Sequence, residues 1–339
     1  MKKKQITLKD IAKALNLSPS TVSRSLKDLP EISSETKKIV QEYAQEHKYK
    51  PNALALSLKT QKSNIIGVII PEIVHYFFSS VLSGIEEEAE KNDYKVLFCQ
   101  SNENYEREII CTETLLSTQV CGVLVSLSKE TTKFQHFQEI IDNNIPIVFF
   151  DRICTGINTD KVVVDDYTGA FNAVEYLINT GCKRIALLGG SPILAISNNR
   201  RMGYEDALRK YKIPVDKSLM FICDTTTSAL EIVPQILRKE KIPDAFFAIN
   251  DEVAAICINI INDFGIKIPD KISVCGFTNS YMSNFTSPDL TSVDQRGFEV
   301  GTTAARLLIN RLQGEENKEG IISKVIKTKL VVRGSTKSI

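Results

Sequence analysis

The chain of 339 residues contains no tryptophan and no apolar run long enough to cross a bilayer, which takes about 20 residues. Its basic first residues, Met-Lys-Lys-Lys-Gln, precede the polar segment Thr7 to Asp10 instead of the apolar core of a secretion signal. Composition is otherwise that of an ordinary soluble globular protein. These absences exclude a membrane protein and predict a cytoplasmic one.

The sequence also lacks any Cys-x-x-Cys pair. Its eight cysteines are scattered, mostly within apolar runs. Buried free thiols are therefore a better interpretation than a disulfide framework or a zinc site.

Signatures of common enzyme sites are missing as well. There is no glycine-rich dinucleotide or P-loop motif, no paired zinc-binding histidines and no nucleophile elbow. The turn at 189–192 follows a strand and could meet a phosphate, but a simple tight turn is the plainer interpretation. His47, His75 and His136 form no ligand or triad pattern. We therefore predict no catalytic residue, no metal and no cofactor.

Charge is present but unevenly distributed. Residues 1–60 hold 12 Lys and Arg against 6 Asp and Glu, whereas the whole chain has a net charge of only +1. A basic head on an acidic body suggests a polyanionic partner for the head, although a solvated basic surface is the alternative.

Two short helices are predicted in this head. Thr7 can cap a first helix that runs to about Ala14. Ser18 can cap a second helix, which begins at Pro19, a favoured first position for proline, and runs to about Leu26. A third helix begins after Ser33. Short helices joined by a tight turn, with a third closing the core, indicate a helix-turn-helix.

The second helix has a small, polar outer face suited to the major groove of DNA. Arg24 could pair with guanine edges, while Ser20, Thr21 and Ser23 could reach phosphates or bases. A three-helix protein-binding module is the structural alternative, and the spacing of the whole pattern favours DNA.

A short apolar stretch, residues 51–58, follows the head. Pro51 ends the preceding helix and Asn52 can cap about two turns that carry Leu54, Leu56 and Leu58. A helix this short is marginal in water, so we expect it to fold only when something packs on its leucines. An apolar linker is the alternative.

Beyond residue 64, strand and helix patterns alternate strictly, in two successive series. This alternation predicts parallel sheets covered by helices, arranged as two similar lobes. Ligands bind beyond the carboxyl ends of such strands, where Asp151, Asn250, Thr278 and Asn279 fall. Taken singly, each of these residues could equally be a cap or turn residue.

Several motifs together resemble the LacI/GalR family of transcription regulators. In the head and hinge they are Thr7 to Ala12, Ser18-x-x-Thr21-Val22-Ser23-Arg24, Ile32-Ser33 and Tyr49-x-Pro51-Asn52-Ala53. In the body they include Phe77-Phe78, Phe150-Asp151-Arg152, Arg200-x-x-Gly203-Tyr204, Asn250-Asp251 and Val332 to Ser335. The resemblance covers almost the whole chain.

This resemblance implies a hinge helix that folds on the operator and wedges Leu58 into the minor groove. It implies a sensor similar to periplasmic sugar-binding proteins, with Phe77 and Phe78 packing on an effector ring. Residues at the positions of Asp151, Arg200 and Asn250 commonly hold effector groups in the family. Thr278 stands where many members have aspartate, so the effector class is not carried over.

We interpret the chain as a sequence-specific DNA-binding transcriptional regulator, most simply a repressor, controlled by a sugar-related effector. The fold class is α/β, with an all-α helix-turn-helix head and a two-lobed periplasmic-binding-protein-like sensor. Alternatives are a solute-binding protein without a DNA role, a sugar-modifying enzyme, or a regulator controlled by a protein corepressor. The expected partners are double-stranded operator DNA, a small-molecule effector and a second copy in a homodimer.

Domain boundaries and site residues follow from these motifs. We expect a head at 1–50, a hinge at 51–63 and a sensor at 64–339, with lobe one at 64–161 plus 293–322 and lobe two at 162–292 plus 323–337. Expected DNA-binding residues are Thr7, Ser18, Ser20, Thr21, Ser23, Arg24, Ser33, Asn52, Ala55 and Leu58. Expected effector-binding residues are Phe77, Phe78, Asp151, Arg200, Asn250, Thr278 and Asn279.

The hinge interpretation predicts the effect of Leu58→Ala. Specific operator binding should weaken because the apolar wedge is lost, while effector binding should stay near normal. Operator titration beside calorimetry tests both expectations. Unchanged operator affinity would make residues 51–58 a linker only.

Overall fold

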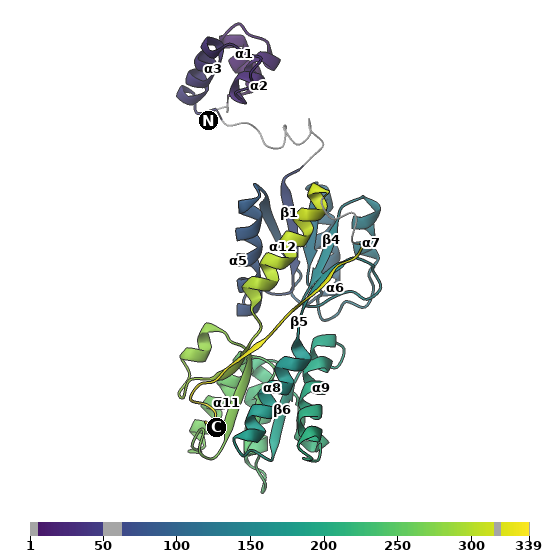
Figure 1. Cartoon of the computed structure of the whole chain (residues 1–339), viewed down its shortest axis with the longest axis vertical. Helices are drawn as coiled ribbons and strands as arrows, with labels where there is room; N and C mark the ends of the chain where they lie inside the picture. Colours follow the sequence, from purple (N-terminus) through teal and green to yellow (C-terminus); the bar gives the residue numbers. More distant parts are fainter. Residues whose placement is uncertain (1–5, 50–62, 315–319, 339) are drawn as a thin grey trace. The chain divides into compact units, whose positions relative to one another are not determined.

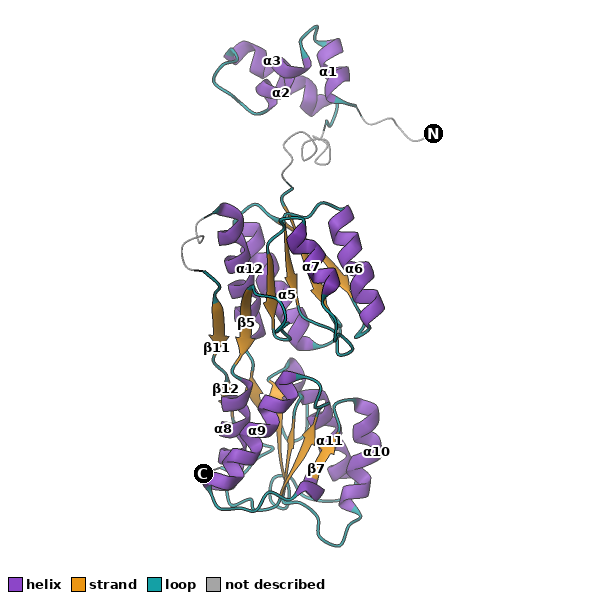
Figure 2. Cartoon of the chain, turned by 90° about the vertical axis from the view of Figure 1, so that its right-hand side faces the viewer, coloured by secondary structure: helices purple, strands orange, loops and turns teal. Residues whose placement is uncertain are grey.

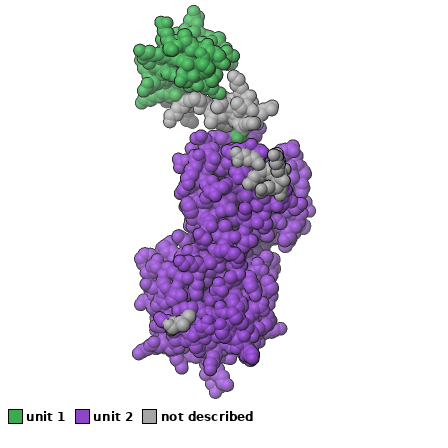
Figure 3. Space-filling view, in the orientation of Figure 1, with its two compact units in different colours: residues 1–63 green, residues 64–339 purple. Residues whose placement is uncertain are grey.

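The computed structural model of the chain describes residues 6–49, 63–314 and 320–338. It consists of two compact units, residues 1–63 and residues 64–339 (Figure 3). The predicted hinge helix, with its expected DNA contacts Asn52, Ala55 and Leu58, lies outside the described residues.

The first unit contains three helices, α1 (Leu8–Ala14), α2 (Pro19–Leu26) and α3 (Ser34–Glu46), whose predicted limits are confirmed. Their spacing gives each helix one apolar side. These sides meet in a small core of buried residues: Ile11, Ala12, Val22, Val40 and Ala44.

Lobe one of the second unit is built on a parallel six-stranded sheet with the order β11-β5-β4-β3-β1-β2 (Figure 2). Its strands are β1 (Ile65–Ile70), β2 (Lys95–Gln100), β3 (Gly122–Val125), β4 (Ile147–Phe150), β5 (Asp160–Val164) and β11 (Ser323–Ile326). Helices α5 (Tyr76–Lys91) and α12 (Gly297–Gln313) cover one face, and α6 (Tyr105–Ser117) and α7 (Gln135–Asp142) the other.

Lobe two repeats this plan with the order β12-β10-β9-β8-β6-β7. Its strands are β6 (Ile185–Gly189), β7 (Met220–Ile222), β8 (Ala245–Ala248), β9 (Ser273–Thr278), β10 (Thr291–Asp294) and β12 (Lys329–Val331), the last antiparallel to β10. Helices α8 (Asp166–Asn179) and α9 (Ala195–Lys210) cover one face, and α10 (Thr226–Leu237) and α11 (Asp251–Asp263) the other. Two single turns complete the lobe, η1 (Lys217–Leu219) and η2 (Tyr281–Asn284).

The chain crosses between the lobes three times, after β5, after β10 and after β11 (Figure 1). These positions correct the expected lobe limits. β5 stays in the first sheet to Val164, not residue 161, and β10 stays in the second sheet to Asp294. β11 belongs to lobe one, paired with β5, although 323–337 was assigned to lobe two. Three of its four residues are exposed, so this edge strand gave no apolar pattern to read.

Two helices also differ from their predicted extents. The sequence predicts a helix over 201–210, but α9 begins six residues earlier, at Ala195. The added turns contain Ser197 and two asparagines, which are weak helix formers, but burial of Ser197 and Arg200 in the tertiary structure outweighs that preference. α12 was not predicted as a helix, although its buried Val300, Ala304 and Leu307 have helical spacing.

Helices α5 and α12 lie unusually close together. A Cβ atom on Gly84 would collide with the backbone carbonyl of Phe298, and one on Gly301 with that of Val81. Only glycine permits this backbone approach, so the two helices pack as one layer against the sheet.

This packing predicts that Gly301→Ala destabilises lobe one. The added methyl group meets backbone, which cannot rotate aside, so we expect a loss of about 1–3 kcal/mol in the free energy of unfolding. Chemical denaturation measures the loss. Glu113→Ala, at an exposed position of α6, is the control and should change stability by less than about 0.5 kcal/mol. Equal stability of both variants would contradict the close-packing argument.

Candidate functional site

The second helix of the head presents a polar outer face. Ser18 caps it by accepting a hydrogen bond from the backbone N–H of Thr21 at 3.0 Å, and its hydroxyl also bonds to those of Ser20 and Thr21. Val22 is fully buried beneath, so the helix has a fixed orientation on the core. Arg24 is exposed, and its side chain makes no hydrogen bond or ion pair with any residue that the structure describes.

The expected head residues differ in how they are used. The Thr7 hydroxyl belongs to a capping box with Asp10, and Ser33 caps α3 by accepting from the N–H of Thr36 at 3.3 Å. Ser18 is likewise a cap. The helix caps of the head do not depend on the side chains of Ser20, Ser23 and Arg24.

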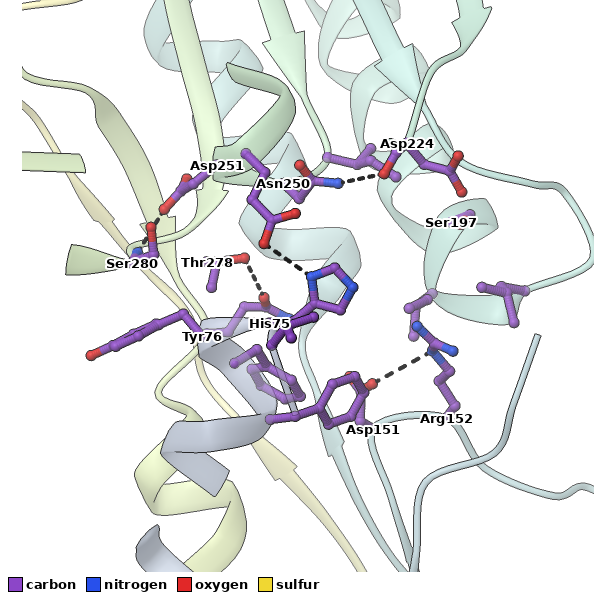
Figure 4. A pocket seen from close by; sticks show the side chains of 18 of the residues that line it. His75, Tyr76, Asp151, Arg152, Ser197, Asp224, Asn250, Asp251, Thr278 and Ser280 are labelled. Carbon is purple, nitrogen blue, oxygen red and sulfur yellow. Dashed lines mark hydrogen bonds and ion pairs between the residues drawn. The ribbon is translucent and has the colours of Figure 1, made fainter. Parts of the chain in front are cut away.

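The second candidate site is a cleft between the lobes, lined by loops that follow strands of both sheets (Figure 4). Phe77 and Phe78, at the start of α5, supply two buried rings in an edge-to-face arrangement with centroids 5.4 Å apart. Six of the seven expected effector residues line this cleft: Phe77, Phe78, Asp151, Arg200, Asn250 and Thr278.

Asp151 follows β4 in the left-handed conformation, with φ of +57°, and its side chain is only 5% exposed. Its backbone N–H donates to Val162, which fixes the turn. Burial raises the pKa of Asp151 to about 6, and the guanidinium of Arg152 opposes this shift. The nearest cationic atom is Arg152 Nε, at 3.9 Å from Oδ2, too far for a hydrogen bond.

Arg200 is held in place by lobe two. Nε donates to Asp166 at 2.7 Å, Nη1 donates to the carbonyl of Ile249 at 2.6 Å, and the guanidinium lies 3.9 Å from the ring centroid of Phe277. Burial raises the pKa of Asp166, and the charge of Arg200 lowers it. Nη2 makes no described hydrogen bond, so it is available to a ligand.

The remaining expected residues have structural partners. Asn250 caps α11, accepting from Val253 at 2.8 Å, and donates to the carbonyl of Asp224 at 3.0 Å. Thr278 donates to Gln295 Oε1 at 3.0 Å. Asn279 lies in a second, adjacent cavity, where it donates to Asp294 and accepts from Arg333.

Two residues of the cleft that the sequence analysis did not single out have buried polar atoms without a partner among the described residues. Arg152 donates twice to Glu103 through Nη1, but its Nε, 3.9 Å from Asp151, makes no hydrogen bond to a described residue, and neither does the hydroxyl of Ser280. Arg152 stood inside a quoted motif, so that motif was the available signal. Nothing in the sequence marked Ser280 or Gln295, whose positions depend on the tertiary fold.

Asp251 has a structural role next to the cleft. Its buried carboxylate accepts from the Ser280 backbone at 2.6 Å, from the Ser283 hydroxyl at 2.9 Å and from the Ser292 hydroxyl. Burial raises its pKa, and these hydrogen bonds, that of Ser292 foremost, lower it. Asp251 thereby ties α11 to η2 and β10.

The chain matches two family descriptions, bacterial regulatory proteins of the lacI family over residues 7–52 and a periplasmic binding protein-like domain over residues 174–336. It is 32% identical over 336 residues to catabolite control protein A of Priestia megaterium, covering 98% of this chain and 99% of the relative. It is 31% identical over 334 residues to the transcriptional repressor CytR of Escherichia coli K12, covering 98% and 97%. The chain belongs to the lacI family.

Solved structures agree with this membership. The structure of the Lac repressor dimer bound to operator and an anti-inducer matches with a TM-score of 0.87 at 24% identity. The match covers 99% of this chain and 100% of the Lac repressor chain, and it shows a shared fold. A LacI-family regulator from Enterococcus faecium with bound ribose has a TM-score of 0.71 at 28% identity, covering 80% of this chain and 98% of its own.

As a lacI-family protein, the chain is a DNA-binding transcriptional regulator and not an enzyme. In the part of the chain that the structure describes, no helix has the length and apolar character to cross a membrane, and no cluster of His, Cys, Asp and Glu could hold a metal ion.

The exposed Arg24 predicts a loss of sequence discrimination in Arg24→Ala. Binding to a DNA site selected from a random pool should weaken by about 1–3 kcal/mol, with little change on random DNA. Lys27→Ala, which removes one positive charge just beyond α2, is the matched control and should weaken both alike. Titrations at fixed salt measure the difference, and equal losses for Arg24→Ala on both DNAs would remove Arg24 from base recognition.

Proposed function

We propose that this lacI-family regulator is a dimeric repressor whose operator affinity is set by a neutral, hydroxyl-rich effector of the sugar class bound between its lobes. The observation that carries the effector class is the loose ion pair between the Asp151 carboxylate and Arg152 Nε, a buried N–H that makes no hydrogen bond to a described residue. A carboxylate that can only accept and a guanidinium N–H that can only donate stand 3.9 Å apart in a buried site.

A hydroxyl group is the ligand chemistry that serves both partners, because it donates to the carboxylate and accepts from Arg152 Nε. The faces of a sugar ring also carry C–H groups, which suit contact with Phe77 and Phe78. The Ser280 hydroxyl and Nη2 of Arg200 add further polar positions.

The charges of the cleft argue against an anionic effector, which the sequence alone left open. Five carboxylate residues line it against His75 and three lysines and arginines. His75 lies between Glu72 and Glu252, and the other three cations are also paired: Lys129 with Asp224 at 3.5 Å, Arg152 with Glu103 at 2.7 Å and Arg200 with Asp166 at 2.7 Å. A phosphate would therefore meet a surplus of negative charge.

The relatives support this proposal. The E. faecium regulator holds ribose, and the Lac repressor binds its operator as a dimer. On this basis the head of each subunit contacts one half of a near-palindromic operator through Ser20, Thr21, Ser23 and Arg24. Asn52, Ala55 and Leu58 would complete the contact in the hinge.

The decisive experiment is a selection of bound sequences from a random DNA pool, followed by release assays with neutral sugars and their phosphate esters. Release by a neutral sugar at lower concentration than by its ester supports the proposal. Release only by the ester would overturn the effector class, and failure to select any sequence would overturn operator binding.

Asp151→Asn should weaken binding of that sugar by about 10- to 100-fold, because the charged acceptor of its hydroxyl groups is lost. Effector-free operator binding should remain. Asp263→Asn, at an exposed position in α11, is the control and should bind normally. Calorimetry measures both, and unchanged affinity in Asp151→Asn would remove Asp151 from the effector site.

The pKa of Asp151 near 6 also predicts a pH dependence. Hydroxyl donors stabilise the ionised carboxylate and lower its pKa, so effector binding releases protons. This contribution to affinity is present above about pH 6 and is lost as the pH falls through that value. Calorimetry on wild type and Asp151→Asn over this range should show a loss of effector affinity at acid pH in the wild type alone.

A further inference from the structure

His75 bridges the two lobes. It precedes α5 in lobe one, and its Nδ1 lies 3.0 Å from Oε1 of Glu252, in the first turn of α11 in lobe two (Figure 4). Its Nε2 lies 2.9 Å from Oε2 of Glu72, which belongs to lobe one like His75 itself. The three side chains are about one-third exposed, so water screens the contacts only in part.

Both partners of the ring are carboxylates, which only accept hydrogen bonds when ionised. A neutral imidazole carries a single N–H and presents a lone pair at its other nitrogen. It could donate to one glutamate and would face the other with lone pair against negative charge. Between two ionised carboxylates, both contacts are hydrogen bonds only when both ring nitrogens are protonated, which makes His75 an imidazolium.

The pKa of His75 is raised from its ordinary value, chiefly by the hydrogen bond to Glu252, while burial opposes the shift. Glu72 raises it further. Glu72 moves with His75 and Glu252 does not. Separation of the lobes therefore removes the hydrogen bond and the charge of Glu252, which together outweigh the burial that separation also relieves. The closed arrangement thus has the higher pKa.

We propose that His75 is a proton-operated latch, in which closure of the lobes binds a proton shared between Glu72 and Glu252 and opening releases it. The regulator would then sense pH in addition to its effector. Histidine suits this role because its charge changes within the physiological pH range.

The direction of the pH dependence follows from the linkage between proton binding and closure of the lobes. Because the pKa is higher in the closed state, the latch contributes its full stabilisation at pH values below the open-state pKa. That contribution is lost as the pH rises through the closed-state pKa. Each unit between the two values changes the ratio of closed to open protein about tenfold.

Other ionisable groups line the same cleft. Asp151, with a pKa of about 6, makes no ion pair across the lobes, and Asp151→Asn removes it from the measurement. Lys129 and Asp224 form a second pair between the lobes without a histidine. The remaining charged residues lining the cleft are Glu103, Arg152, Arg200 and Asp251.

The first test measures the proton directly by NMR. The chain has three histidines, so the resonances of His75 can be assigned with His75→Gln in the full-length protein. We expect Glu252→Gln to lower the pKa of His75. A His75 titration identical in wild type and Glu252→Gln would overturn the latch.

The second test measures the lobes without any effector. A fluorophore pair at the exposed positions Glu139 in α7 and Glu231 in α10, in dimers with one labelled chain, reports their separation. At about pH 6 the closed population should exceed that at about pH 8 several-fold. The same dependence should persist in Asp151→Asn.

Two variants complete this test. His75→Gln should abolish the pH dependence, because glutamine cannot take up the proton. Lys129→Gln should favour the open form at both pH values and keep the dependence, because the pair it breaks holds no histidine. Wild-type separations that are equal at the two pH values, or a dependence that survives in His75→Gln, would overturn the proposal. Neither measurement uses an effector or DNA, so such a failure would leave the proposed function standing.

Discussion

The cleft depends on a constraint of chain topology: three crossings connect two sheets whose carboxyl ends face one another. Parallel strands all end at the same edge, so each sheet places its strand-to-helix turns at that edge. Joining the sheets there, after β5, β10 and β11, brings the two sets of turns together. Residues as distant in sequence as Phe77 and Gln295 thereby line one cleft.

The charges in this cleft are arranged for movement as well as for binding. Lys129 and His75 each reach a carboxylate of the opposite lobe, whereas Arg152 and Arg200 are paired within their own lobe. The first two contacts can break when the lobes separate. The other two remain intact and keep the ligand-facing groups in position, so the site is preorganised in either arrangement.

Much of this molecule could be predicted from local pattern. The caps Thr7, Ser18 and Ser33 predicted where the three head helices begin, since capping is a local interaction. β1 and β4 are buried on both faces, so each could be recognised in the sequence as a continuous apolar run. Six of the expected effector residues line one cleft. Each of them lies in or next to a helix or strand that the sequence predicted.

What could not be predicted depends on contacts between distant segments. β11 has only one buried residue and is a strand because β5 offers it an edge, and the extra turns of α9 exist because Arg200 finds Asp166. Ser280 lines the cleft because Asp251 binds its backbone from 29 positions away. Periodicity carries no information on such pairings. Asp151 could therefore be predicted as a site residue, whereas the roles of Arg152 and Ser280 in the cleft could not.

Because α5 and α12 pack so closely, they move together with the sheet of lobe one as a rigid body. α12 begins at the second crossing, where Arg296 adopts a left-handed conformation, and the glycine contacts lock it to α5. A rotation at that pivot cannot be absorbed by slippage between the helices. It is carried along β1, which is about 20 Å long, to its start at Ile65, at the far edge of the sheet. Over such a lever arm a rotation of a few degrees at the pivot becomes a displacement of about one to two ångströms where the chain enters the sensor, about a third to a half of the ~3.4 Å rise between base pairs of DNA.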